Sequence, residues 1–427
     1  MIGTDFKLTE SCECEQIFPS ELREEAAAIF DREGFPTTKH EEWRFTSLRE
    51  IAETQFEFEP AAIGVGASDI DAVAMPANAS RLVFIDGKFD VELSQTVDLP
   101  DGVVISSLKY AITEHRELVQ SNLGKIIAVD ETPFVALNTR TVQDGAFVLV
   151  PKGIVLEKPI YVVHVATNQA APTLTNPRTL LIFGEDSQGK VVETALSLGG
   201  RTWQNSVTEA VVGDNAIVEH VRLQLGSEEA YHITNMQVAQ GRTANFKTTV
   251  VSLGGKIVRN DINGLLNGEG TECTMNGLYV GRKEQHVDNH TRLDHAFPHC
   301  PSHELFKGVL ADKSSAVFNG KIIVRQIAQK TDSKQSNMTL LLSDDATINT
   351  KPQLEIFADD VRCTHGATIG RLEDEAMFYL RSRGIPQNEA RSLLIYAFAS
   401  DVLDRIGIEE VRDTLEARLF DGFHQTT

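Results

Sequence analysis

The pattern of apolar and polar positions divides the chain into a helical beginning, a long β segment and a helical end. Between residues 145 and 361, strand-like runs alternate with short turns rich in Gly, Asp or Asn, and almost no helical period appears. Along residues 217–225, apolar residues alternate with the polar His220, Arg222 and Gln224. This period of two is typical of a half-buried strand.

Similar turns recur along the β segment. Gly213-Asp-Asn-Ala216, Gly241-Arg-Thr-Ala244 and Gly268-Glu-Gly-Thr271 begin 28 and then 27 residues apart, and Ala311-Asp312 and Ser343-Asp-Asp-Ala346 follow less regularly. A drifting repeat of this kind predicts a β-solenoid, in which each turn buries its apolar face against the next. A β-sandwich is the alternative fold.

Helical periods flank the β segment. Apolar spacing predicts a helix over residues 11–33 that ends at Gly34 and Pro36, and Arg81-Leu-Val-Phe-Ile85 before Asp86-Gly87 predicts half of a hairpin. The helical period returns after Gly370. We therefore predict an N-terminal helical and mixed region over residues 1–145, a β core over 146–366 and a C-terminal helical domain over 367–427.

The second C-terminal helix has apolar residues around much of its circumference, which is more than a peripheral helix can bury alone. This predicts that it packs on a partner. The residues concerned are Leu393, Leu394, Ala397 and Phe398.

Composition and charge narrow the classes of partner and the compartment. The 427 residues contain 40 Lys and Arg against 61 Asp and Glu, a formal charge of −21, which disfavours nucleic acid and anionic lipid. The longest apolar run, residues 393–399, is too short to span a bilayer, and the N-terminus has no basic region typical of a signal peptide. The five cysteines follow no disulfide pattern, so we expect a cytoplasmic protein.

One segment matches the spacing of a phosphate-binding loop. Gly184-Glu-Asp-Ser-Gln-Gly189-Lys190 is followed by Val191, where a Mg²⁺-binding Ser or Thr is required, and then by a strand-like run. Its two acidic residues would also repel phosphates. We therefore interpret it as a solenoid turn, and expect a chain that binds no nucleotide and is not an enzyme.

Metal-capable side chains gather between His286 and His303. On a strand, His286, Asp288 and His290 share one side, and imidazole with carboxylate suits Zn²⁺, Fe²⁺ or Mn²⁺. A metal-dependent hydrolase is therefore the alternative function. The structural interpretation is a polar strand face whose imidazoles hydrogen-bond to neighbouring strands. A carbohydrate-active β-helix finds no support, because no paired carboxylates stand out along the chain.

A thiol and an imidazole lie two residues apart in Cys363-Thr-His365-Gly366, so an extended chain places both on one side. We expect no function for the other close pair, Cys12-Glu-Cys14, which lies in an acidic terminal segment.

Several of these segments together resemble the SufB/SufD family of iron–sulfur cluster assembly proteins, and within it the SufD members. The similar segments are Glu41-Glu-Trp-Arg-Phe-Thr46, His286–Ser302, Gln329-Lys-Thr-Asp332, Gln335-Ser-Asn337, Pro352-Gln-Leu-Glu-Ile356, Ala358-Asp-Asp-Val361, Cys363-Thr-His-Gly-Ala-Thr368 and Phe378-Tyr-Leu-Arg-Ser-Arg-Gly384. SufB proteins carry a cysteine in the strand that corresponds to residues 335–340, and none is present here. The resemblance therefore favours SufD.

The resemblance implies a right-handed parallel β-helix core with helical regions on both sides. It also implies a scaffold that acts with SufB and the ATPase SufC, with the C-terminal helices docking SufC. A transient iron–sulfur cluster shared with SufB would lie at the SufB–SufD interface, ligated by His365 and, as a weaker candidate, Cys363. Neutral imidazole suits a cluster that is passed on to acceptor apoproteins. Whether the chain also forms a homodimer is left open.

Overall fold

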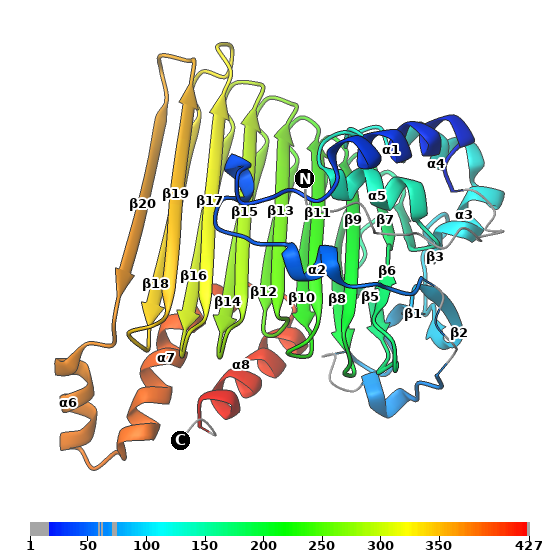
Figure 1. The fold of residues 1–427 in the computed structure, drawn as a ribbon. Coiled ribbons are helices and arrows are strands. Elements are labelled where there is room, and N and C mark those ends of the chain that lie inside the picture. The colour runs from blue at the N-terminus through cyan, green and yellow to red at the C-terminus, as the bar shows by residue number, and fades with distance from the viewer. Residues whose placement is uncertain (1–16, 59, 61–62, 71–74, 425–427) are drawn as a thin grey trace.

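The computed structural model describes residues 17–58, 60, 63–70 and 75–424, with side chains described up to residue 420. Its core is a β-helix made of two ten-stranded sheets (Figure 1). Sheet 1 contains β19 (Thr347–Ile356), β17 (Ser315–Val324), β15 (His286–His295), β13 (Ile257–Leu266), β11 (Tyr231–Gln240), β9 (Thr202–Val212), β7 (Arg178–Phe183), β4 (Ala146–Val150) and β3 (Val104–Ser107), with β6 (Thr173–Thr175) beside β9. Sheet 2 contains β2 (Lys88–Gln95), β1 (Ser80–Ile85), β5 (Ile160–Ala166), β8 (Gln188–Ser197), β10 (Ile217–Leu225), β12 (Asn245–Ser252), β14 (Glu272–Gly281), β16 (Pro301–Leu310), β18 (Asp332–Leu341) and β20 (Arg362–Gly370).

From β7 to β20, consecutive strands alternate between the two sheets. Each therefore pairs in parallel with the strand two places along, as β10 does with β8 and β12. Only the pairs β1–β2 and β3–β4 are antiparallel among the described strands. The predicted mainly β fold with a parallel β-helix core and flanking helices is confirmed. The β-sandwich alternative is wrong, because its hairpin connections would make neighbouring strands antiparallel.

The repeated turns form two stacked rows, one on each edge of the β-helix. The regularly spaced turns at residues 213–216, 241–244 and 268–271 all lead from sheet 1 to sheet 2. Their backbones are linked, since the Asn215 amide donates to the Arg242 carbonyl (2.9 Å) and the Thr243 amide to that of Glu269 (2.9 Å). The turns at 311–314 and 343–346 lead back from sheet 2 to sheet 1. The predicted repeat became irregular there because those turns belong to the other row.

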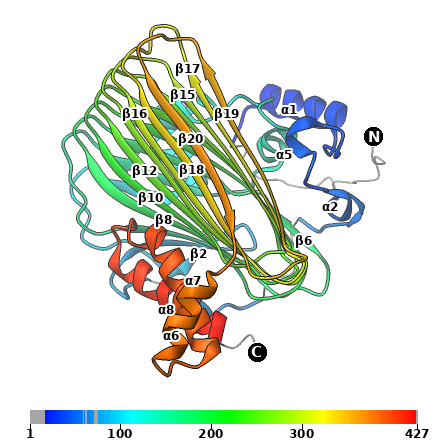
Figure 2. The ribbon, with the colours of Figure 1, turned by 90° about the vertical axis from the view of Figure 1, so that its left-hand side faces the viewer.

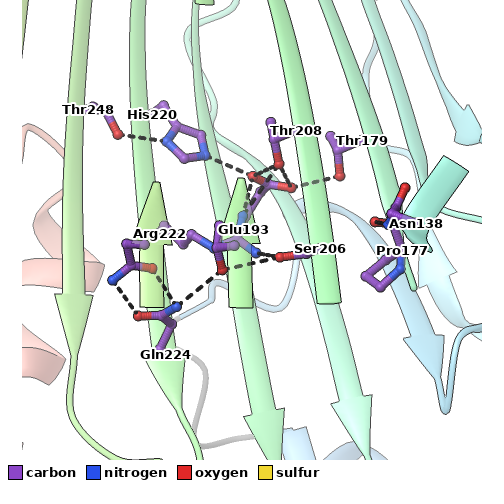
Figure 3. Close-up of polar contacts among 12 residues, drawn as sticks. Asn138, Pro177, Thr179, Glu193, Ser206, Thr208, His220, Arg222, Gln224 and Thr248 are labelled. Atoms are coloured by element: carbon purple, nitrogen blue, oxygen red, sulfur yellow. Dashed lines mark hydrogen bonds and ion pairs between the residues drawn. The ribbon is translucent and has the colours of Figure 1, made fainter. Parts of the chain in front are cut away.

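Apolar and polar residues do alternate along β10, but most of the polar side chains point inward and most of the apolar ones point outward. His220, Arg222 and Gln224 point into the β-helix and are buried, and Ile217, an apolar position, is 48% exposed. Figure 3 shows that His220 and Arg222 meet Glu193 of β8 inside the core. Gln224 instead donates to Asn260 of sheet 1 (2.8 Å). The expectation of a half-buried strand is therefore wrong, because the outward apolar side chains of this strand are covered by helices.

Glu193 is the centre of this inner polar group. Its carboxylate accepts hydrogen bonds from Thr179 (2.7 Å), Thr208 (2.9 Å) and Arg222 (3.0 Å), and His220 Nε2 lies 3.0 Å away (Figure 3). Burial alone would raise the pKa of Glu193, but Arg222 and His220 hold it well below its usual range. A buried charge of this kind is tolerated only when it is paired and fully hydrogen-bonded.

Helices cover the two outer faces of the β-helix on opposite sides (Figure 2). On sheet 1, helix α5 and the aromatic residues of the N-terminal segment pack against β9 and β11, and on sheet 2 the C-terminal helices cover the outward apolar side chains of β8–β16. The α-helices are α1 (Ser20–Glu33), α2 (Arg49–Glu53), α3 (Leu108–Glu114), α4 (Arg116–Asn122), α5 (Pro133–Thr141), α6 (Asp374–Ser382), α7 (Gln387–Leu403) and α8 (Glu409–His424), and two 3₁₀ helices span Glu41–Trp43 and Ala67–Ile70.

The N-terminal predictions are largely confirmed where the structure describes them. The predicted helix over 11–33 begins at Ser20 and ends at Glu33, and residues 11–16, with Cys12 and Cys14, lie outside the described residues. The hairpin is present as β1 and β2, joined by Asp86 and Gly87 with φ of 47° and 81°. Two successive positive φ angles are the geometry that Asp-Gly favours in a tight hairpin.

The segment that resembled a phosphate-binding loop is a solenoid turn. Residues 184–187 join β7 to β8, and Asp186 takes the left-handed conformation with φ of 58°. Lys190 lies on β8, where its Nζ donates to the Gly407 carbonyl (2.7 Å) in the link between α7 and α8. The lysine therefore helps to attach the C-terminal helices to sheet 2.

Candidate functional site

Cys363 and His365 lie on β20, the last strand of sheet 2, at the end of the β-helix where no described strand covers the outer edges of β19 and β20. β20 pairs in register with β18, so Cys363 lies beside Ser333 and His365 beside Gln335. Because side chains alternate across a strand, both candidate ligands share the side of sheet 2 that faces the interior. His365 is exposed and Cys363 is half-buried. The two predicted ligands are therefore brought together at an open end.

The surroundings of Cys363 are apolar. Its side chain packs against a small cluster that includes Ile322, Val324 and Ala328. Burial raises the pKa of the Cys363 thiol, although the backbone of Ser333 partly opposes this by hydrogen bonding. A thiol is a poorer metal ligand than a thiolate, so Cys363 is less ready to bind a metal at neutral pH than a free cysteine would be.

Polar residues continue inward from both candidate ligands. Ser302 and Ser333 are joined through their hydroxyls (2.7 Å), and His295 Nε2 lies 3.0 Å from Ser302 Oγ. In the adjacent row the Gln335 amide nitrogen donates to the carboxylate of Glu304, which is only 3% exposed. Burial raises the pKa of Glu304 to about 7, against the smaller lowering effect of Gln335. A carboxyl group that titrates near neutral pH thus lies two strands beneath His365.

His286, Asp288 and His290 share the outer face of sheet 1, where they bind a segment of the N-terminal region. Thr46 donates to Asp288 (2.5 Å) and lies 2.8 Å from His286 Nε2, and His290 Nδ1 lies 3.2 Å from Glu42. The segment concerned, residues 41–46, is one of those on which the family resemblance rests. These three side chains therefore fasten the N-terminal segment across sheet 1.

A cation already occupies the charged centre of this group. Arg259 of β13 donates to Asp288 (2.7 Å) and stacks over Trp43, with 4.3 Å between the guanidinium carbon and the ring centre. Burial alone would raise the pKa of Asp288, but Arg259 and His290 hold it well below its usual range. Among the residues that the structure describes, no three His, Cys, Asp or Glu side chains are arranged to hold a metal ion.

The predicted partner-binding residues of α7 differ in their exposure. Ala397 is exposed, Leu393 and Leu394 are half-buried, and Phe398 packs on the molecule's own sheet 2. Lys307 of β16 lies over the Phe398 ring (4.5 Å) and donates to its carbonyl (2.9 Å). The helix thus uses much of its apolar surface within its own chain.

The structure also reveals residues that the sequence pattern did not single out as candidates. Phe378 and Tyr379 of α6 are 73% and 55% exposed, and no residue of α6 is buried. Glu193 and Glu304 are buried inside the β-helix. An acidic residue inside an apolar run, as in Val-Val-Glu193, was the only sequence signal for such a buried carboxylate, and nothing in the sequence indicated its partners.

Comparisons with known proteins identify the family. The model of the SufBD core domain of the SUF system for FeS cluster assembly matches residues 164–398, and that of the SufBD N-terminal region matches residues 11–162. The chain therefore belongs to the SufBD family of iron–sulfur cluster assembly proteins, as the resemblance predicted.

Curated relatives are similar over most of their length. An iron–sulfur cluster assembly SufBD family protein of Synechocystis is 34% identical over 92% of this chain and 88% of its own. The iron–sulfur cluster assembly protein SufD of Escherichia coli is 33% identical over 91% of this chain and 89% of its own, and SufD of Bacillus subtilis is 30% identical over 88% and 87%. Within the described part of the chain, no helix is long and apolar enough to cross a membrane.

The first prediction concerns the pH dependence that Glu304 gives to stability. The pKa of Glu304 is raised from 4.5 to about 7 in the folded protein, so the folded state binds its proton more tightly than the unfolded chain does. The protonated Glu304 therefore stabilises the fold fully below pH 4.5, and this stabilisation is lost as the pH rises through about 7. The loss lowers the free energy of unfolding by roughly 3 kcal/mol at most. Glu304→Gln removes this loss. We expect the difference in melting temperature, variant minus wild type, to be larger at pH 8 than at pH 5.

Thermal melts across this pH range check the prediction, with Glu355→Gln on β19 as the control because that carboxylate is exposed. An equal difference at both pH values for Glu304→Gln would contradict a buried carboxylate with a raised pKa.

The second prediction separates a structural from a metal-binding role for Asp288. Asp288→Asn removes a charge that Arg259 and Thr46 both require, so we expect the free energy of unfolding to fall by about 1–3 kcal/mol. The metal content of the purified protein should not change. Urea unfolding and elemental analysis measure the two quantities, and Asp294→Asn, a more exposed position of the same strand, is the control. Loss of stoichiometric zinc or iron on mutation would instead favour the hydrolase alternative.

Proposed function

We propose that this protein is a non-catalytic scaffold subunit for iron–sulfur cluster assembly in the cytoplasm, acting with a SufB partner and the ATPase SufC. The observation that carries the proposal is the pair Cys363 and His365 on the last strand of a β-helix with an open end. A cluster bound there would be cargo, held between two subunits and passed on to apoproteins.

The strand edges at this end favour pairing with another β-helix. β19 and β20 are 10 and 9 residues long, and no described strand pairs with their outer edges. Long edges of this kind have unpaired N–H and C=O groups that another chain can satisfy. Ile356, Phe357 and Ile369 add exposed apolar side chains around them, at 39%, 63% and 49% exposure. A SufB β-helix would complete the pairing, and a second copy of this chain is the alternative occupant.

His365 is the favoured ligand for chemical reasons. Neutral imidazole can bind iron without first losing a proton from its ligating nitrogen, whereas the thiol of Cys363 must ionise in a partly apolar environment that raises its pKa. Replacing a charged thiolate by imidazole also leaves a cluster less anionic. Such a site suits a cluster that is transferred onward.

The C-terminal helices are proposed to dock SufC. The exposed aromatic residues of α6, Phe378 and Tyr379, together with Ala397 and the half-buried Leu393 and Leu394 of α7, would supply the apolar contact. Phe398 would contribute less, because it packs against Lys307.

The third prediction tests the ligand role of His365. In the complex assembled with SufB and SufC, His365→Ala should abolish cluster formation and leave subunit assembly intact, while Cys363→Ser should have a milder effect. Cluster absorbance of the purified complex and complementation of a strain that lacks the protein measure the outcome. Normal absorbance and full growth with His365→Ala would refute the ligand role, provided that SufB still copurifies.

The fourth prediction tests the docking surface for SufC. Replacing Phe378 and Tyr379 together by Ser should reduce SufC copurification at least about tenfold, because aromatic anchors supply much of the binding energy at interfaces. The melting temperature should stay within about 2 °C of wild type, because neither side chain is buried. Val91→Ser, which changes a 71% exposed residue of β2 at the other end of the β-helix, is the control. Undiminished SufC binding by the double variant would contradict the proposed surface.

A further inference from the structure

Two rows of inward-facing polar side chains end at the two candidate ligands. The in-register pairing of β16, β18 and β20 stacks one residue from each strand directly beside the next. The rows, read from the buried strand outward, are Ser302, Ser333 and Cys363, and Glu304, Gln335 and His365.

The second row contains an amide with a free acceptor. Gln335 is 3% exposed, and its Nε2 atom donates to the carboxylate of Glu304. Its Oε1 atom is buried and accepts no hydrogen bond from any residue that the structure describes. A buried acceptor without a hydrogen-bond partner is destabilising, so a donor within reach of this oxygen is favoured.

Gly320 of sheet 1 limits where this amide can lie. A Cβ atom added to Gly320 would come within 2.1 Å of Gln335 Nε2, so the absence of a side chain there leaves the space that the amide occupies. The Glu304 carboxylate and Gly320 both lie nearest to the Nε2 atom of Gln335, and the row neighbour on the next strand is His365.

The β-helix joins row neighbours through their side chains elsewhere. Such hydrogen bonds link Ser302 to Ser333 (2.7 Å), Asn260 to Asn289 (2.9 Å) and His220 to Thr248 (2.9 Å). Neighbouring strands lie about 4.8 Å apart, so a glutamine and a histidine in register are within the same reach. We propose that Gln335 Oε1 accepts a hydrogen bond from the ring N–H of His365, and that Glu304, by holding the Gln335 amide, fixes which imidazole nitrogen is left free.

The orientation of the amide decides the tautomer of the ring. In the structure the Glu304 carboxylate accepts from the NH₂ group of Gln335, which leaves Oε1 for His365. At pH 8, above the pKa of about 7 of Glu304, the ionised carboxylate can only accept hydrogen bonds and keeps the amide in this orientation. The ring nitrogen that faces Gln335 must then carry the proton, and the lone pair of the other nitrogen points away from the row. Hydrogen bonds of this kind orient metal-ligating histidines in many proteins. Gln335 and Glu304 are thus positioning residues, and only their benefit to cluster binding rests on the proposed function.

The tautomer of His365 can be measured directly by NMR on the isolated full-length chain. The protein has 12 histidines, so ¹⁵N-labelled histidine gives a small set of ring signals, and comparison with His365→Ala assigns those of His365. At pH 8 we expect one tautomer of His365 to predominate. The tautomer mixture of a solvated imidazole in the wild-type protein would overturn the proposal without any variant.

Two variants on opposite sheets test the cause. Gln335→Leu removes the acceptor, and Gly320→Ala displaces the amide, so each should return His365 to the solvated mixture. Ser333→Ala changes the adjacent row, which ends at Cys363, and should leave the His365 tautomer as in wild type. A His365 tautomer unchanged in Gln335→Leu would overturn the proposal, and if that variant does not fold, Gly320→Ala and the wild-type spectrum still decide.

Cluster formation is measured separately, so that the proposed function and the hydrogen bond can fail independently. In the complex with SufB and SufC, Gln335→Leu should lower the affinity for the cluster by about 10-fold or more, the usual effect of losing a hydrogen bond that orients a ligand. A normal cluster with His365→Ala would refute the ligand role, whereas the NMR result would still report on the hydrogen bond.

Discussion

The structure depends on the in-register stacking of parallel strands. Because each strand pairs with the strand two places along at a constant register, every inward-facing side chain lies against its equivalents on the neighbouring strands. A polar residue in such a row can be buried only if side chains of its own row, of an adjacent row or of the facing sheet supply its hydrogen bonds. Glu193 meets this condition, because Arg222, His220 and two threonines supply its hydrogen bonds. The core of this β-helix therefore contains a buried ion pair and is not uniformly apolar.

The same stacking explains why the two faces of the β-helix need helical covers. Since part of the interior is polar, many apolar positions of sheet 2 face outward, including Val221, Leu223 and Leu225. They are buried by Ile395, Ala399 and Val402 of α7 and by residues of α8, which makes the C-terminal helices part of the core. The N-terminal segment covers sheet 1 in a similar way, with Trp43 beneath Arg259.

Stacking also sets the difference between the two ends of the β-helix. At the first end, β2 and β3 pair antiparallel with β1 and β4, and Phe89 and Tyr110 both line a cavity of about 370 Å³. At the last end, no described strand pairs with the outer edges of β19 and β20, and the two candidate ligands lie on β20. The two candidate ligands therefore lie where the inward-facing rows end, on the last strand of sheet 2.

The sequence by itself determined the class of fold and the location of the candidate ligands. The spacing of Gly213, Gly241 and Gly268 predicted a solenoid because each turn must bury its apolar face against the next. The spacing of Cys363 and His365 places both on one side of any strand. Only the tertiary structure decided which face of β10 points into the β-helix and that helices cover the other face, because alternation gives a period but not a direction. It also decided that His286, Asp288 and His290 bind residues 42 and 46, and that Glu304 lies beneath His365. Those contacts join residues far apart in the chain, and their partners depend on strand register, which no local pattern specifies.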